Sequence, residues 1–176
     1  KEAKMGSVIV LAVSAALLLA GLIEDALHQR RIRSIKIRVN VNGTRGKSSV
    51  TRLIAAGLRA GGIRTFAKTT GTTPRLILPD GSEEPIRRRG RAHISEHIHV
   101  ARRASRGGAE ALVVECMALE PENQLVYEHR LVKSTIGVIT NIRLDHLDVM
   151  GPELDDVAAA LAITVPDKGH LVTTDG

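Results

Sequence analysis

The chain has 176 residues, the size of one domain with room for a small appendage. Apolar residues make up 43% of it, enough for a buried core, and the formal net charge is +6. Phe66 and Tyr127 are its two aromatic residues. Recognition of single-stranded nucleic acid by stacking needs exposed rings, so this composition argues against a nucleic-acid partner. The single cysteine, Cys116, cannot form an internal disulfide, consistent with a reducing compartment.

Residues 1–34 are predicted to form a membrane anchor and a basic juxtamembrane segment. Residues 5–23 are 19 residues without a charge, which as a helix would extend about 28 Å, close to the ~30 Å hydrocarbon thickness of a bilayer. A cleavable signal peptide is the alternative, but no small-residue cleavage site follows Leu22. Basic residues are denser after the run than before it, so we expect a single-pass protein of the cell membrane whose main domain is cytoplasmic.

Residues 35–49 carry the first chemical signal. Residues 35–41 alternate between apolar and polar and predict a strand, and a helical pattern begins at Lys47. A strand that turns through glycines into a helix leaves outward-pointing N–H groups at the positive end of the helix dipole, which binds phosphate. Lys47 is then expected to reach the β- and γ-phosphates, and the Ser48 hydroxyl to ligate Mg²⁺.

The match to the common phosphate-loop pattern G-x-x-x-x-G-K-[ST] covers its second half. Val41 stands at the first glycine position, and an extra glycine follows at Gly43. The alternative is an ordinary strand-turn-helix connection that happens to carry Gly and Lys. The order strand, loop, helix favours the phosphate loop.

The rest of the chain alternates between strand and helix patterns, which predicts an α/β fold with a parallel sheet. A threonine-rich loop, residues 69–74, follows the second predicted strand, at the sheet edge where ligands bind in open α/β folds. The expected elements are a helix at 48–60, a strand at 63–68, a hairpin or small excursion at 76–86, a helix at 93–104, a strand at 109–117, a short helix at 120–130, a strand at 134–140, a helix at 152–162 and a strand at 169–174.

Two further stretches place polar groups at strand ends. Glu115 ends an apolar strand, where a carboxylate is costly to bury unless it is paired or bound to a cation. Its neighbour Cys116 is interpreted as a small core residue, since no base is identifiable nearby. After the next strand, two acids, an amide and an imidazole crowd residues 141–148. Helix capping by Asp145 or Asp148 is the alternative, but it leaves His146 unexplained.

The predicted helix at 93–104 carries a second histidine cluster. His93 and His97 are four residues apart, with Glu96 and His99 close by. Metal binding is conceivable, but no third ligand stands at a recognised spacing. We therefore expect an exposed or partly buried helix face.

Together these stretches resemble the ATP-binding central domain of the Mur ligase superfamily, and within it the ligase subunits of poly-γ-glutamate synthases, the makers of a capsule polymer. The resemblance covers residues 35–176 and implies a P-loop NTPase-like, mostly parallel sheet flanked by helices. An N-terminal hydrophobic segment is also similar to those subunits. The matching text is VNGTRGKS at 41–48, TTGTTP at 69–74, ECMAL at 115–119 and TNIRLDHLD at 140–148.

The resemblance also implies site residues and cofactors. ATP and Mg²⁺, with Mn²⁺ as an alternative, would be the cofactors, and Lys47 and His146 the catalytic residues. Thr73 stands where relatives often carry Ser, and Asp145 would support His146. The residues implied to hold ATP are Asn42, Gly43, Thr44, Arg45, Gly46, Lys47, Ser48, Ser49 and Asn141. The residues implied to hold metal are Ser48, Thr73, Glu115 and His146.

The implied activity is an ATP-dependent amide ligase that adds glutamate to a growing poly-γ-glutamate chain through an acyl phosphate. Other membrane subunits of such a synthase are the implied partners, and a homo-oligomer is compatible with the sequence. The basic cluster at residues 87–91 is a hypothetical contact for the acidic polymer. The C-terminal domain of the family has no counterpart in these 176 residues, so we expect a fragment, a processed piece or one part of a longer protein, inactive by itself.

Two other functions remain open at this point. A membrane-tethered P-loop kinase or NTPase switch would turn over nucleotide without glutamate. A membrane-tethered scaffold that binds anions through its basic clusters would show steep salt dependence and indifference to substitution of Lys47.

Overall fold

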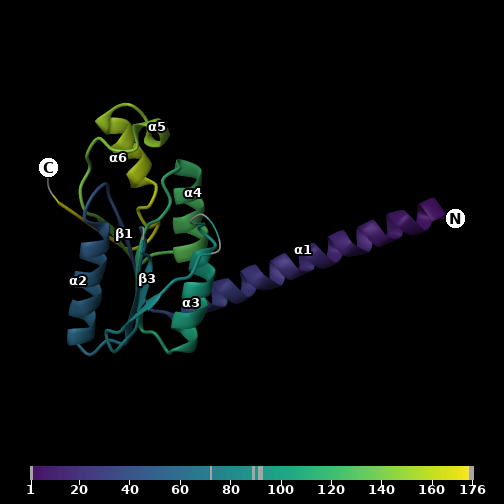
Figure 1. Ribbon diagram of the computed structural model, residues 1–176, viewed down its shortest axis with the longest axis horizontal. Coiled ribbons are helices and arrows are strands. Elements are labelled where there is room, and N and C mark those ends of the chain that lie inside the picture. Colours follow the sequence, from purple (N-terminus) through teal and green to yellow (C-terminus); the bar gives the residue numbers. More distant parts are fainter. Residues whose placement is uncertain (1, 72, 89, 91–92, 175–176) are drawn as a thin grey trace.

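Seven strands form one sheet in the computed structural model, which describes residues 2–71, 73–88, 90 and 93–174 (Figure 1). The order across the sheet is β4-β3-β2-β5-β1-β6-β7. The strands are β1 (Ile37–Asn42), β2 (Thr65–Thr69), β3 (Arg75–Ile77), β4 (Glu83–Pro85), β5 (Ala111–Glu115), β6 (Ile136–Ile139) and β7 (His170–Thr173). The helices are α1 (Glu2–Ser34), α2 (Lys47–Ala60), α3 (Glu96–Arg106), α4 (Pro121–Val126), the π-helix η1 (Tyr127–Val132), α5 (Leu147–Met150) and α6 (Leu154–Ala162).

The neighbouring strands β2, β5, β1, β6 and β7 run parallel to one another, as the sequence predicted. The chain pairs β2 with β5, β5 with β1, β1 with β6 and β6 with β7 in parallel. The antiparallel pair β3–β4 lies beside β2, which confirms the hairpin expected at 76–86. Val41 is level with Glu115, and Asn42 with Ile139. The loops after β1, β2, β5 and β6 therefore meet at one edge of the sheet.

The sheet is covered on both faces. Helix α2 lies over one face, and α3, α4 and η1 lie over the other (Figure 1). Successive residues of a strand point to opposite faces, so Leu112 and Val114 join the core on the α3 side while Val113 joins the core under α2. All three are buried, and burial of each such side chain contributes about 1.5–3 kcal/mol.

The predicted helix at 120–130 is two elements. Pro121 occupies the first turn of α4, a position where its missing N–H is not needed. From Tyr127 the chain widens into η1, and Lys133 N donates to Glu128 O at 2.6 Å. The helix expected at 152–162 begins at Leu154 behind a capping box of Glu153 and Asp156. Helix α5, with its single turn, was not predicted.

Helix α3 corrects one prediction about the histidine cluster. His93 and His99 are exposed, but the His97 side chain is 0% exposed, so an exposed or partly buried position is wrong for this residue. Its place in the sequence explains the burial, since His97 shares the inward stripe of α3 with Val100, Ala101 and Ala104. The His97 ring packs edge-on against Tyr127, with ring centroids 5.4 Å apart.

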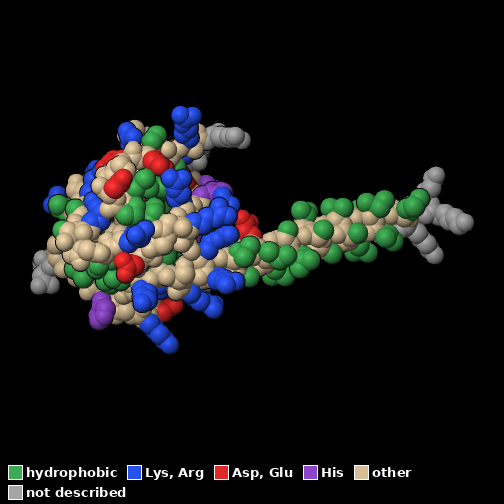
Figure 2. All heavy atoms as spheres, turned by 90° about the horizontal axis from the view of Figure 1, so that it is seen from below, with side chains coloured by type: hydrophobic (Ala, Val, Ile, Leu, Met, Phe, Trp, Pro, Cys, Tyr) green, Lys and Arg blue, Asp and Glu red, His purple; other side chains and the backbone are tan. Residues whose placement is uncertain are grey.

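Helix α1 projects from the domain as a rod (Figure 1). Residues Met5–Ser34 are long and apolar enough to cross a membrane, and their most hydrophobic stretch is not buried in the structure. Figure 2 shows hydrophobic side chains all along the rod, with Lys and Arg gathered where it meets the domain. The last turns pack on the domain, where His28 and Ile32 are each 1% exposed. The predicted anchor is thus a candidate membrane span that continues into the fold.

Candidate active site at the phosphate loop

The loop between β1 and α2, residues 43–46, needs two glycines. Gly46 is the N-cap of α2 and has a φ of 81°, and Gly43 has a φ of 125°. Side chains rarely adopt such positive φ values. A Cβ on Gly43 would also lie 2.9 Å from the backbone nitrogen of Thr140. Packing therefore requires the extra glycine at Gly43, which the common phosphate-loop pattern lacks, because the loop lies directly against the end of β6.

Asn141 holds the phosphate loop in shape. Its Oδ1 accepts from Thr44 Oγ1 at 2.6 Å and from the backbone nitrogen of Arg45 at 3.1 Å. Its Nδ2 donates to the Arg45 carbonyl at 3.0 Å. These bonds join the loops after β1 and β6. In this structure the side chain predicted to contact nucleotide is directed at the loop itself.

Asn42 supports the same loop from the interior. Its side chain is buried and donates to Gln124 Oε1 at 2.9 Å and to Thr164 Oγ1 at 3.1 Å. Its Oδ1 accepts from the nitrogen of Gly43 at 2.8 Å. The structure thus places the Asn42 side chain behind the loop, away from the surface that a nucleotide would touch.

Lys47 lies at the first position of α2 and turns back over the loop. Its Nζ donates to the Gly43 carbonyl at 2.6 Å and to the Thr44 carbonyl at 3.5 Å. The Lys47 ammonium therefore lies at the N-terminus of α2, where the helix dipole is positive. An anion bound there would be attracted by both the ammonium and the dipole. The surrounding depression is lined by Thr44, Arg45, Gly46, Lys47, Ser48, Ser49 and Glu115.

Ser48 and Glu115 are brought together as predicted. Ser48 Oγ donates to Glu115 Oε2 at 2.8 Å, and the backbone nitrogen of Thr70 donates to the same oxygen at 2.7 Å. Glu115 is 5% exposed. A hydroxyl and a carboxylate are the hard oxygen donors that Mg²⁺ prefers, so this pair fits a divalent cation. Three loops, after β1, β2 and β5, meet at this one carboxylate.

The other two predicted metal ligands are not assembled with this pair. His146 lies at the N-cap of α5 with a φ of 50°, and its Nε2 is 4.0 Å from Asp145 Oδ1. Asp145 is paired through its other oxygen, Oδ2, with Arg45 at 3.2 Å. Thr73 is exposed on its loop. Across the described ranges, no three His, Cys, Asp or Glu side chains form a group that could hold a metal.

The capping alternative for the acids of residues 141–148 is also not what the structure shows. Helix α5 has His146 as its N-cap, with no side-chain cap bond. Asp145 Oδ1 accepts from the His146 nitrogen at 3.1 Å, which stabilises the turn before the helix.

Cys116 is a core residue, as interpreted from the sequence. It is 1% exposed, and burial raises the pKa of its thiol to about 12. A thiol with that pKa is not ionised near neutral pH and is no nucleophile.

A buried ion network, which was not predicted from the sequence, lies behind the threonine-rich loop. Lys68 is fully buried at the end of β2, and its Nζ lies 2.8 Å from Glu96 Oε1. Arg88 Nε lies 2.7 Å from Glu96 Oε2. Burial lowers the pKa of Lys68. Burial also opposes ionisation of Glu96, but the bonds from Arg88 and Lys68 outweigh it, and the pKa of Glu96 is lowered.

This network also holds the threonine-rich loop. Arg88 donates to the Gly71 carbonyl at 3.1 Å and to Thr70 Oγ1 at 3.3 Å, and Thr70 in turn donates to Glu115. A signal was present in the sequence, because a lysine in an apolar strand requires an acid partner. Of the basic cluster at 87–91, Arg89 and Arg91 lie outside the described residues.

Comparisons with known proteins agree with this geometry. The family model described as Mur ligase middle domain matches residues 41–167. The chain is 46% identical over 163 residues to PGA synthase CapB of Bacillus subtilis (strain 168), covering 92% of this chain and 42% of that protein. It is 46% identical over 161 residues to the capsule biosynthesis protein CapB of Bacillus anthracis, covering 90% and 35%. The chain thus spans about two fifths of the length of these curated relatives.

Solved structures with the same fold include folate enzymes. An Escherichia coli FolC in complex with ADP has a TM-score of 0.56 at 18% identity, covering 86% of this chain and 41% of that one. A bifunctional folylpolyglutamate synthase/dihydrofolate synthase with Mn, AMPPNP and L-glutamate bound has a TM-score of 0.61 at 17% identity, covering 85% and 40%. At these identities the likeness shows the fold, and it confirms the predicted sheet flanked by helices.

Proposed function

The chain belongs to the family of Mur ligase middle domains, and from this premise we propose that it is the ATP-binding part of an amide ligase of the poly-γ-glutamate synthase type. The γ-phosphoryl group of ATP passes to a carboxylate at the end of the polymer, which gives an acyl phosphate and ADP. The amine of an incoming glutamate attacks the carbonyl carbon, the amide forms and phosphate leaves. The 46% identity to a PGA synthase supports this choice of substrate.

The single observation that carries the proposal is the meeting of Ser48 and Glu115 beside the phosphate loop. The loop amides and the Lys47 ammonium would bind the phosphates of ATP, with Lys47 exchanging its two carbonyl partners for phosphate oxygens. A Mg²⁺ or Mn²⁺ ion held by Ser48 and Glu115 would neutralise charge on the transferring phosphoryl group. Thr70, through its bond to Glu115, keeps that carboxylate aimed at the loop.

His146, Thr73 and the remaining loop residues complete the proposed site. His146 follows β6 at the sheet edge where the loops after β1, β2 and β5 also lie, and we retain it as a second metal or catalytic group. We retain Thr73 as a metal ligand by its place in the threonine-rich loop. Asn42 and Asn141 act through the shape of the phosphate loop, by the bonds described above.

The same proposal places the protein at the cell membrane. Helix α1 would span it once, with Arg31 and Arg33 in its last turn on the cytoplasmic side beside the catalytic domain. Other membrane subunits that pass the acidic product onward are the partners we propose.

The test uses the natural full-length protein and measures ADP release with and without glutamate. We expect release that depends on glutamate in the wild type and a loss of about 100-fold or more in Lys47→Ala, because the transferring charge loses a positioned cation. His146→Ala should also lower the rate if that residue acts in catalysis. Arg106→Ala, on the far end of α3, is the matched control. Glutamate-independent ADP release in every variant would contradict the ligase, and glutamate-independent release that is lost in Lys47→Ala would favour a kinase or switch.

A further inference from the structure

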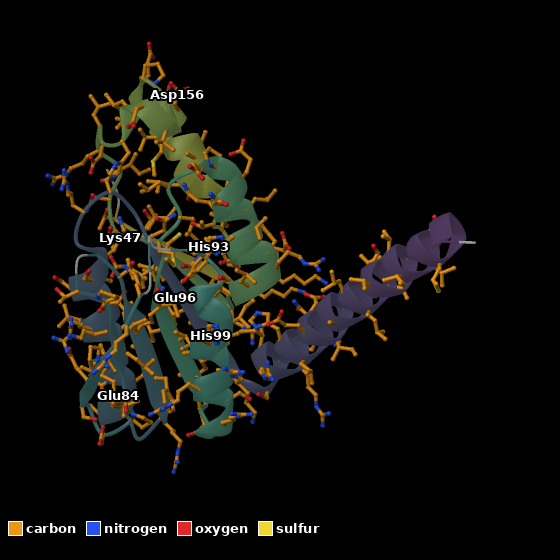
Figure 3. All side chains as sticks on the ribbon, turned by 45° about the vertical axis from the view of Figure 1, so that its right-hand side comes forward. Lys47, Glu84, His93, Glu96, His99 and Asp156 are labelled. Atoms are coloured by element: carbon orange, nitrogen blue, oxygen red, sulfur yellow. The ribbon has the colours of Figure 1, made fainter. Side chains whose placement is uncertain are left out.

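A cavity of about 390 Å³ lies against α3, and its other walls come from β3 and residues 86–88. Arg87, Arg88 and Arg103 contribute to its walls, together with His93, His99 and Glu96. Figure 3 shows His93, Glu96 and His99 following one another along α3 and the segment before it, with His93 level with Lys47 in this view. The cavity therefore extends toward the edge of the sheet that carries the candidate active site.

The charges of this cavity are unbalanced. Its one acid, Glu96, is already satisfied by Lys68 and Arg88, so it does not offset the other arginines. Within the part of the chain that the structure describes, no hydrogen bond or ion pair engages Arg87. Arg103 pairs with Glu84 at 2.8 Å, but both side chains are about half exposed, and such pairs contribute little. The Arg87 guanidinium is thus open to an anion, and Arg103 can exchange its exposed partner Glu84 for one.

The floor of the cavity is apolar, with Leu76, Ile86 and Val100 among its lining residues. A ligand that fits must combine anionic groups with short hydrocarbon stretches. A phosphate or nucleic-acid backbone would leave this floor uncovered. A γ-glutamyl chain carries one carboxylate per residue separated by methylene groups, and it matches both the guanidinium groups and the floor.

A second cavity continues in the direction of the active site. It shares His93 with the first, also includes Ile94, and is otherwise lined by residues 117–120 and Asn123, which follow the end of β5; Glu120 is the one acid among these described residues. Glu115, the proposed metal ligand, is the last residue of that strand. The two cavities meet at His93 and lead from the arginines to Met117, two residues beyond Glu115.

We propose that Arg87 and Arg103 bind carboxylates of the acidic polymer, so that its growing end passes His93 toward Glu115. The proposal rests on the proposed function for the identity of the polymer, and it assigns to this cavity the task of holding the acceptor chain. Arg88 is a positioning residue here. It is bonded to Glu96, Gly71 and Thr70, and it links the wall of the cavity to the loop that holds Glu115.

The test measures binding of a fluorescent γ-glutamyl decamer to the full-length protein in detergent, without ATP. Arg87→Ala combined with Arg103→Ala should weaken binding by about tenfold or more, because even one lost charge-assisted hydrogen bond is worth about that factor. Arg106→Ala, an equally exposed arginine of α3 outside the cavity, should bind as the wild type does. Both substituted side chains are exposed, so unfolding curves should show the double variant folded. An unchanged dissociation constant in the double variant overturns the proposal.

Two further measurements separate this inference from the proposed function. With a γ-glutamyl dipeptide as acceptor, the double variant should keep its kcat, while its KM for the decamer rises about tenfold. Glutamate-dependent ADP release with unchanged decamer binding would overturn the cavity assignment and leave the ligase standing. Loss of decamer binding in the double variant, together with no glutamate-dependent ADP release in the wild type, would support the cavity assignment and contradict the proposed ligase. Displacement of the decamer by single-stranded DNA of equal charge, at equal concentration, overturns the choice of a polycarboxylate.

Discussion

His97 shows what burial does to one titratable group in this fold. Its side chain is fully buried between α1, α3 and η1, beside His28 and Tyr127. Burial holds the pKa of His97 well below its ordinary value of 6.5, and the positive charge of Lys68 lowers it further. The native protein therefore keeps this imidazole neutral under conditions in which the unfolded chain would protonate it.

That difference makes stability depend on pH. As pH falls below about 6.5, the unfolded chain binds a proton at residue 97 that the native chain does not, so the free energy of unfolding should fall by up to about 1.4 kcal/mol per pH unit. His97→Phe keeps a ring against Tyr127 and should remove this part of the slope. Urea denaturation in detergent at pH 7.5 and 5.5 measures it.

His99→Phe is the control for that experiment, because His99 is exposed on the same helix and its loss should leave the slope unchanged. Equal pH slopes in wild type and His97→Phe would show that the buried imidazole is not the group responsible.

At the scale of an element, the phosphate loop depends on two glycines that differ in their surroundings. A Cβ at Gly43 would meet the Thr140 backbone, whereas a Cβ at Gly46 would meet open space. Gly46→Ala should therefore cost about 1–2 kcal/mol of unfolding free energy, from positive φ alone. Gly43→Ala should cost about 1–3 kcal/mol more, since the loop must also move away from β6.

Denaturant unfolding of the two alanine variants, each compared with wild type, checks this ranking. Each substitution adds one methyl group to the same loop, so each serves as the control for the other. An equal loss in both would mean that the close approach to Thr140 relaxes without cost.

The elements that could be predicted are those set by local pattern. Alternation predicted β1, a continuous apolar run predicted β5, and the glycines with Lys47 predicted the turn into α2, so Ser48 and Glu115 could be assigned to one site in advance. The π-helix η1 could not be foreseen, because its widened turn serves a contact distant in sequence. Glu128 there accepts from Asn40 Nδ2 at 2.8 Å, and no local periodicity records that bond.

Packing between distant segments also explains why two features near the site were not predicted. The link from Lys68 through Glu96 to Arg88 joins residues from three separate segments. Lys68 in its apolar strand indicated that an acid partner was needed, but nothing local identified Glu96 as that partner. The burial of His97 likewise depends on α1 and η1 packing over α3. The spacing of the apolar residues on α3 indicates which face points inward, but long-range packing decided how deeply His97 is buried and which acid pairs with Lys68.

At the scale of the whole molecule, α1 is one helix in two environments. Leu18, in the projecting part, is 70% exposed, whereas Ile32 is 1% exposed against the domain. The junction is also polar. His28 Nε2 lies 2.8 Å from the Leu131 carbonyl, and Gln29 Nε2 donates to the Arg130 carbonyl at 2.9 Å. A candidate membrane span is thereby continuous with a helix that forms part of the core, which orients the domain relative to the span.

Matched truncations of the two side chains test this division of α1. Ile32→Ala should lower the unfolding free energy of the domain by about 2–4 kcal/mol, because it leaves a cavity in packed surroundings. Leu18→Ala should change the unfolding free energy by less than about 0.5 kcal/mol in detergent, because the Leu18 side chain is exposed and is not packed against the domain. Equilibrium denaturation followed by circular dichroism of both variants gives the comparison. If the two variants lost equal stability, α1 would not be docked on the domain through its last turns, and the span would be a flexible tether that leaves the domain free to rotate.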